Sequence, residues 1–154
     1  MLIQSLSLKN FRNIASLEIT PSPGINVIYG ENAQGKTNIL ESLYYLSLLS
    51  SFRAARDREL IRIGEEAAAL DAAVFSEERD RAISIRIPAS GRREVTVNRV
   101  RAARKADAAG IVKCVLFCPE DLDLIRGASA RRRRFLDDAI SQLWPNYISL
   151  LSEY

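Results

Sequence analysis

The chain contains no histidine, and only two of its 154 residues are cysteine. A structural zinc site normally takes four cysteine or histidine ligands, so this composition excludes one. Cys114 and Cys118 lie in the apolar stretch KCVLFC, where alternation along a strand directs both thiols, with Leu116, to one face. Because cysteine outside disulfides is among the most buried residue types, we predict two buried and unreactive thiols.

Long apolar runs are also missing. No stretch approaches the roughly 20 apolar residues that a membrane helix needs. The start, MLIQSLSLKNFRN, lacks the features of a secretory signal, so we predict a cytoplasmic protein with no membrane partner. The length suits about one domain. The chain stops at SLLSEY, inside an apolar-periodic segment with no cap or breaker, which predicts a fragment of a longer protein.

Neither sign of charge dominates, with 22 lysines and arginines against 19 acidic residues. This small basic excess is weak evidence for an anionic partner. The distribution is more informative, because basic residues cluster at 53–58, at 92–105 and in the run Arg131 to Arg134. Acidic residues gather separately, at 65–66, 77–80 and 120–123.

The apolar patterns predict an α/β fold. A buried helix is expected from Lys36 to about Leu49, because its apolar residues recur at helical spacing on more than one face. A further helix is expected to begin at Pro119, and a final one at the cap Ser129, its apolar stripe continuing past Pro145. Strands are expected over 2–11, 14–19, 25–30, 68–75, 81–87, 93–100 and 111–117, with an antiparallel meander between 68 and 100.

Two of the seven glycines flank a lysine directly after the expected strand 25–30, in GENAQGKTN. A strand, then Gly30-x-x-x-x-Gly35-Lys36-Thr37, then a helix is a phosphate-binding loop in the context that supports it. Glycine lets the backbone approach an anion, and the loop amides and the helix N-terminus donate to it. Lys36 suits the β- and γ-phosphates of ATP, and the Thr37 hydroxyl suits Mg²⁺. The predicted cofactor-binding residues are Gly30, Glu31, Asn32, Ala33, Gln34, Gly35, Lys36, Thr37 and Asn38.

Hydrolysis requires more than phosphate binding, namely an acidic residue on the metal and a group that positions water. In VLFCPED, an apolar run followed by Glu120 and Asp121 imitates a Walker B strand. Pro119 intervenes, however, and PEDLDLI fits a helix start with acids in its first turn. We favour the helix start, which leaves this chain without a complete catalytic set.

Four stretches resemble the N-terminal part of the RecF family, bacterial DNA repair ATPases related to SMC and ABC-type heads. They are SLSLKNFRNIASLEI, GINVIYGENAQGKTNILESLYYLS, SFR and VLFCPEDLDLIRGASARRRRFLDDAI. LKNFRN and GENAQGKTN fit several SMC-like families, and PEDL followed by RRRFLD narrows the match to RecF. The resemblance implies that 1–128 form an ABC/SMC-type P-loop ATPase lobe, with a mixed sheet around the phosphate-loop helix plus an antiparallel β meander. Residues 129–154 would lead toward a helical second lobe.

The resemblance further implies a role in DNA replication, DNA repair and the SOS response. Such heads form a homodimer on ATP, bind single-strand/double-strand junctions of DNA, and support recombinase loading with RecO- and RecR-like mediators. The remaining catalytic motifs would lie beyond Tyr154. A full-length protein would therefore be a slow DNA-dependent ATPase, while the activity of this chain alone stays open.

Three residues outside the loop are further candidates under this resemblance. The segment after the first strand approaches the nucleotide in SMC-like heads, which places Arg12 and Asn13 near it; a plain surface turn is the alternative. Glu120 stands where such heads carry a metal-contacting glutamine, and is a candidate metal ligand beside Thr37.

Two other functions stay open for the chain. One is a self-contained small P-loop kinase or NTPase that uses Glu120 or Asp121 as its metal acid. The other is a nucleotide-sensing module that does not hydrolyse.

The run Arg131 to Arg134 lies at the positive end of a helix dipole, which costs about 0.3–1 kcal/mol for each exposed charge. Either nearby acids such as Asp137 and Asp138 compensate the run, or DNA phosphates do. We favour an internal charge network over DNA contact. Because basic and aromatic residues do not alternate, any DNA contact is expected at phosphates rather than at stacked bases.

Overall fold

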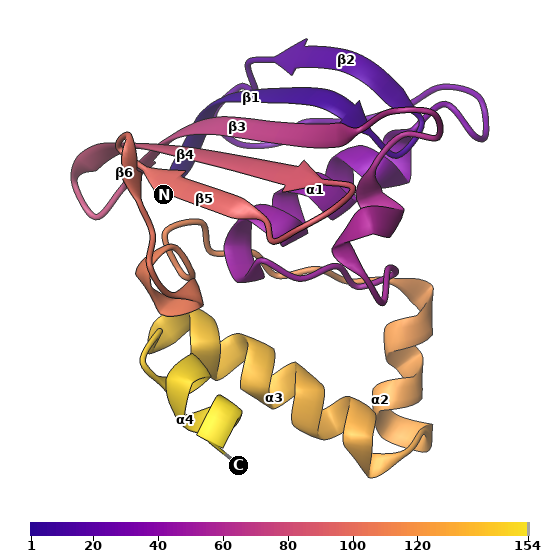
Figure 1. Cartoon of the computed structure of the whole chain (residues 1–154). Helices are drawn as coiled ribbons and strands as arrows, with labels where there is room; N and C mark the ends of the chain where they lie inside the picture. The colour runs from indigo at the N-terminus through magenta and orange to yellow at the C-terminus, as the bar shows by residue number, and fades with distance from the viewer. Residues whose placement is uncertain (154) are drawn as a thin grey trace.

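The computed structural model describes residues 1–153, except for the side chains of Glu120, Leu122, Asp123, Arg126 and Ser152. Its main feature is a six-stranded sheet in the order β2-β1-β3-β4-β5-β6, antiparallel at every pairing (Figure 1). The strands are β1 (Leu2–Phe11), β2 (Ile14–Ile19), β3 (Ala67–Ser76), β4 (Arg79–Pro88), β5 (Glu94–Val97) and β6 (Val100–Arg101).

Helices cover one side of the sheet. Helix α1 packs against the sheet, and α3 packs across α1, so the three form successive layers (Figure 1). The helices are α1 (Lys36–Leu48), α2 (Asp123–Arg126), α3 (Ser129–Leu143) and α4 (Tyr147–Glu153), with 3-10 turns η1 (Asp57–Leu60), η2 (Lys105–Asp107) and η3 (Pro119–Leu122). Within the part of the chain that is described, no helix has the length and apolar character that a membrane crossing requires.

Period-two alternation buries one face of the sheet. Along β4, Ile83, Ile85 and Ile87 are at most 1% exposed. Across the β3–β4 pairing, Ile85 lies opposite Leu70, which is fully buried. Each such side chain contributes about 1.5–3 kcal/mol by leaving water. The predicted strands 2–11 and 14–19 and the antiparallel meander are therefore confirmed. The single strand predicted over 93–100 is wrong, because a turn at Asn98 and Arg99 divides it into β5 and β6.

Helix α1 supplies the other half of this core. Tyr45, Leu46 and Leu49 are at most 2% exposed and pack against the sheet. Leu40, near the start of the helix, is 43% exposed. The predicted deep burial is thus confirmed for the later turns and is wrong for Leu40.

The predicted strands 25–30 and 111–117 do not form, and neither segment has regular secondary structure. Tyr29 is 90% exposed and Val115 is 94% exposed. A strand needs a neighbour to take its backbone hydrogen bonds, and among the described residues neither segment has one. An apolar pattern indicates a buried strand, but a strand forms only where a neighbour takes its backbone hydrogen bonds.

Alternation nevertheless persists along 111–117. Cys114, Leu116 and Cys118 are half-buried, whereas Val115 and Phe117 are exposed. The two cysteines therefore lie on one side with Leu116, as predicted, but they are half-buried rather than buried. Burial raises the pKa of the Cys114 thiol, which lowers its reactivity.

The C-terminal helices begin close to the predicted positions. Turn η3 begins at Pro119, and a second helical segment, α4, follows Pro145. The predicted cap is wrong, because α3 starts at Ser129 itself, its N-cap is Ala128, and no side chain caps it. Ser129 is exposed there.

Two buried tyrosines of α1 predict a loss of stability at alkaline pH. Burial is the main cause that raises the pKa of Tyr44 and Tyr45 above the ordinary value of 10.0, and the hydrogen bond from Tyr44 to Asp138 raises that of Tyr44 further. The unfolded chain loses these protons first, so the free energy of unfolding should hold below about pH 10 and fall above it. Chemical denaturation between about pH 8 and 11 measures this fall.

The free energy of unfolding of the Tyr45→Phe variant should fall less at alkaline pH than that of the unsubstituted protein. Tyr29→Phe is the matched control, since Tyr29 is 90% exposed and should leave the pH dependence unchanged. An equal fall in Tyr45→Phe and in the unsubstituted protein would contradict the prediction.

Candidate phosphate-binding site

Residues 30–34 form an exposed loop, and the buried Gly35 joins this loop to the start of α1. Gly30 and Gly35 have φ angles of 143° and 98°. At Gly35 an added Cβ would lie 2.9 Å from the Asn13 Oδ1 atom and 3.3 Å from the Ile14 Cγ1 atom. The positive φ therefore favours glycine at Gly35, and any larger residue would also have to displace the Asn13 and Ile14 side chains.

The backbone amides of this loop are left unpaired. Among the described contacts, no N–H of residues 31–38 donates a hydrogen bond, and the Ile39 N–H is the first of the helix to do so, to the Gly35 carbonyl at 3.0 Å. No side chain caps α1, and its first turn holds no acidic residue. Unpaired donors at the positive end of a helix dipole form an anion site.

Lys36 adds a positive charge beside these amides. Its Nζ donates to the Gly30 carbonyl at 2.7 Å and also to the Glu31 carbonyl. These contacts hold the ammonium group against the backbone of the loop. Binding of a phosphate chain by residues 30–38 stays a prediction.

The predicted metal ligands are only partly described. Thr37 is exposed on the first turn of α1, where its hydroxyl fits a Mg²⁺ ion carried in by a nucleotide. Among the described residues, no group of three or more acidic or cysteine side chains could hold a metal by itself. The side chain of Glu120 lies outside the described residues. Asp121 accepts a hydrogen bond from the Cys118 N–H at 2.7 Å, which supports the helix start over a Walker B acid.

Asn13 contacts the loop directly. Its Nδ2 donates to the Ala33 carbonyl at 2.6 Å, and its Oδ1 accepts a hydrogen bond from Asn38 Nδ2 at 2.7 Å. Asn13 therefore braces the loop between the β1–β2 turn and α1. A contact with the nucleotide itself stays a prediction.

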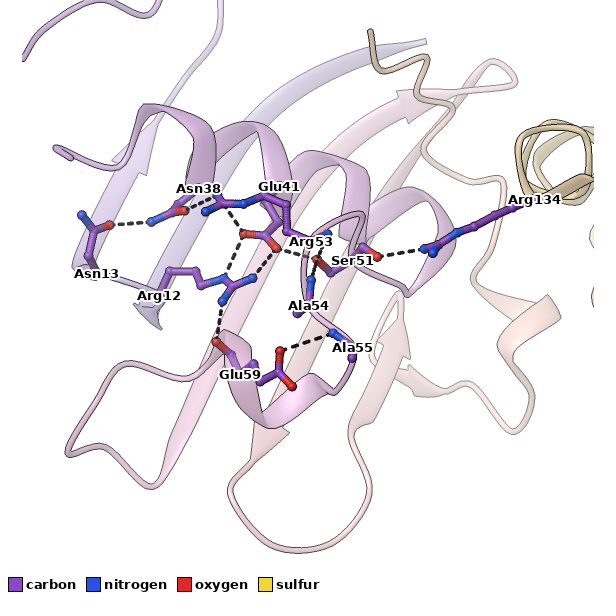
Figure 2. Close-up of polar contacts among 10 residues, drawn as sticks. All are labelled: Arg12, Asn13, Asn38, Glu41, Ser51, Arg53, Ala54, Ala55, Glu59 and Arg134. Atoms are coloured by element: carbon purple, nitrogen blue, oxygen red, sulfur yellow. Dashed lines mark hydrogen bonds and ion pairs between the residues drawn. The ribbon is translucent and has the colours of Figure 1, made fainter. Parts of the chain in front are cut away.

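Arg12 ends on a carboxylate rather than at the loop. Its Nε and Nη2 donate to the two carboxylate oxygens of Glu41 at 2.9 and 2.7 Å, and its Nη1 donates to the Glu59 carbonyl at 2.9 Å (Figure 2). Bidentate pairs of this kind are among the stronger polar contacts in proteins. Arg12 thus ties the β1–β2 turn to α1, and its predicted contact with the nucleotide stays a prediction.

Glu41 was not among the candidates from the sequence, yet it lies at the centre of this network. It is fully buried, one turn after Thr37, and it also accepts from the Ser51 hydroxyl and lies 3.7 Å from Arg53 Nη1 (Figure 2). The available signal was a lone carboxylate within the apolar stripe of α1. A charge at such a position must be paired to be buried.

The network also reaches the arginine run. Arg134 donates to the Ser51 carbonyl at 3.1 Å and lies 3.8 Å from Asp138. Arg132 donates to the carbonyls of Leu124 and Gly127 at 3.2 and 2.9 Å. These two arginines are held by their own chain, as the internal interpretation predicts. Asp137 instead accepts from the Tyr147 hydroxyl, which raises the pKa of Tyr147.

The loop, its helix and the sheet beside them define a nucleotide-binding protein of the P-loop class. Residues 2–122 match the family described as RecF/RecN/SMC N terminal domain. The chain belongs to this family, and the resemblance to RecF read from its motifs is confirmed.

Individual relatives agree with this assignment. The DNA replication and repair protein RecF of Agathobacter rectalis is 39% identical over 154 residues, and that of Halalkalibacterium halodurans is 42% identical over 155 residues. These matches cover this whole chain but 42% and 41% of those proteins. The chain therefore spans about two fifths of the length of these curated relatives.

Solved structures confirm the fold. One described as "Structure of the recombination mediator protein RecF-ATP in RecFOR pathway" matches 99% of this chain and 42% of its own, with a TM-score of 0.88 and 31% identity. An SMC ATPase structure matches 90% of this chain and 99% of its own, with a TM-score of 0.71 and 23% identity. The predicted ATPase lobe of ABC/SMC type is confirmed, although the sheet of the described residues is antiparallel at every pairing and not mixed as predicted.

Proposed function

We propose that this chain is the ATP-binding N-terminal part of a DNA repair ATPase. The observation that carries the proposal is the row of unpaired loop amides at the start of α1, with the Lys36 ammonium group beside them. A triphosphate supplies the anionic oxygens that these donors need. The ATP-bound RecF structure, 31% identical to this chain, supports ATP as the ligand. Mg²⁺ bound to that ATP would take the Thr37 hydroxyl as a ligand.

The rest of the protein would complete the fold. Residues 1–128 form most of the first ATPase lobe, and 129–154 lead into a second, helical lobe. The apolar segments 25–30 and 111–117 support this division, because neither forms a strand, and Tyr29 and Val115 are at least 90% exposed. Strands supplied by residues beyond this chain would pair with them and bury their side chains.

The full-length protein would act as an ATP-gated dimer on DNA. ATP on the loop of one subunit would be closed over by the second subunit, which supplies the groups that this chain lacks. The dimer would bind single-strand/double-strand junctions in the cytoplasm and support recombinase loading with RecO- and RecR-like mediators. Slow hydrolysis would then release it. The relatives are DNA replication and repair proteins, which supports DNA as the partner.

The test uses the full-length protein. Light scattering should show a dimer with Mg·ATP and a monomer with Mg·ADP, and the dimer should bind a gapped duplex more tightly than a blunt duplex of equal length. The proposal would be overturned if the molecular mass did not depend on ATP and the protein bound gapped and blunt duplexes equally. Turnover by residues 1–154 alone, lost in Asp121→Asn, would instead favour a self-contained small NTPase.

A further inference from the structure

A second concave site lies far from the phosphate loop. A cavity of about 820 Å³ opens between the end of β4, the β4–β5 turn, β6 and the η1 and η2 segments. Its lining includes Leu49, just past the C-terminal end of α1, and none of residues 30–38. Since α1 rises about 1.5 Å per residue, the cavity and the loop lie at opposite ends of a helix of 13 residues.

The lining is strongly basic. Seven of the sixteen lining residues are arginine or lysine, and a single one, Asp57, is acidic. Asp57 is already paired, because Arg93 Nη1 donates to its Oδ2 at 2.8 Å. The same Arg93 nitrogen lies 3.0 Å from the Tyr45 hydroxyl and 2.7 Å from the Leu49 carbonyl. Arg93 is therefore a fixed part of the cavity wall rather than an available charge.

Four other arginines of the lining remain available. Within the residues that the structure describes, the guanidinium groups of Arg56, Arg58, Arg92 and Arg101 form no hydrogen bond and no ion pair. All four are exposed, and they come from three separate segments that the fold brings to one rim. Such a concentration of one sign of charge is unfavourable without a counter-charge.

Lys105 lies within this concentration of positive charge. It is half-buried at the cavity wall, and burial, followed by the positive charge of Arg93, lowers the pKa of its ammonium group. An anion in the cavity would offset both effects.

We propose that this basic cavity holds phosphates of the DNA backbone. Available arginines on three segments suit a polyanion with repeated charges better than a single anion. The planar guanidinium group of each arginine can bind a phosphate through two nitrogens. Among the residues that the structure describes, no aromatic side chain lines the cavity, so we expect neither base stacking nor readout of sequence there. Arg132 and Arg134, by contrast, already donate to carbonyls of their own chain. The inference rests on the proposed function, since it names where that DNA is held.

The test compares two double variants of the full-length protein by their ATP-dependent binding of a gapped duplex. Arg92→Ala/Arg101→Ala removes two available charges of the cavity and should weaken binding about tenfold. It should also lower the slope of log K against log salt by about two. Arg79→Ala/Arg99→Ala is the matched control, because both residues are exposed and neither lines the cavity. The control should keep the affinity and the slope of the unsubstituted protein.

The outcomes separate the cavity from the proposed function. Unchanged affinity and slope in Arg92→Ala/Arg101→Ala, or equal losses in both double variants, would overturn the cavity and leave the function standing. Absence of DNA binding by the unsubstituted protein would overturn both. Calorimetric titration with Mg·ATP should give all three proteins the same affinity, because the cavity and the loop share no residue; a loss confined to the cavity variant would count against the inference.

Discussion

Lys36→Ala is expected to reduce ATP affinity at least about a hundredfold, because hydrogen bonds to charged groups contribute about 1.5–3 kcal/mol each and this ammonium group would contact two phosphates. The folded state should lose little. Apart from the Gly30 and Glu31 carbonyls on its own loop, the Lys36 ammonium group has no described partner. Surface changes of this kind usually fall within about 0.5 kcal/mol. Calorimetric titration with Mg·ATP measures the affinity, and thermal denaturation measures the stability.

Lys9→Ala is the matched control for this prediction. Lys9 is an exposed lysine of β1, and its removal changes net charge equally without touching the loop. Its ATP affinity should equal that of the unsubstituted protein. If Lys36→Ala kept its affinity for ATP, the phosphate loop would not be the nucleotide site, and the proposed binding of ATP there would be wrong.

The phosphate loop could be predicted from sequence because its determinants are local. Eight consecutive positions, Gly30 to Thr37, hold the glycines that let the backbone turn and approach an anion, and the lysine that supplies the positive charge. The helix that follows supplies the dipole. The meander could be predicted for a similar reason, since alternation and short turns lie within single segments. Asn13 at the loop came from the family resemblance, and the structure places its side chain on the Ala33 carbonyl.

What could not be predicted depends on contacts between distant segments. Arg12 and Glu41 are 29 residues apart, so a lone carboxylate in an apolar helix gave no sign of its partner. The segments 25–30 and 111–117 have the pattern of buried strands, but a strand also needs a pairing partner, and neither segment has one among the described residues. The basic stretches 53–58 and 92–105 were visible in the sequence, whereas their meeting around one cavity depends on the order of β3, β4 and β5.

Arg12→Ala is expected to lower the free energy of unfolding by about 3–5 kcal/mol, the usual cost of leaving one partner of a buried ion pair alone. Glu41 is fully buried, and the side chain of Arg12 is 21% exposed. The Ser51 hydroxyl and Arg53, at 3.7 Å, remain near the carboxylate, so the loss should lie toward the lower end of that range. The free energy of unfolding of Arg12→Lys should lie between those of Arg12→Ala and the unsubstituted protein. Lysine keeps the charge but cannot make the bidentate contact with the carboxylate. Urea denaturation measures all three proteins.

Three comparisons make this prediction specific to the buried pair. Arg62→Ala breaks an exposed ion pair with Glu65, 3.7 Å apart, and should cost no more than about 1 kcal/mol. The double variant Arg12→Met/Glu41→Leu should recover much of the loss, since apolar pairs often replace buried ion pairs without penalty. ATP affinity of folded Arg12→Lys separates the two roles of Arg12: an unchanged value indicates a brace for α1, and a fall indicates a contact with the nucleotide. A loss in Arg12→Ala no larger than in Arg62→Ala would show that Glu41 tolerates burial without this arginine.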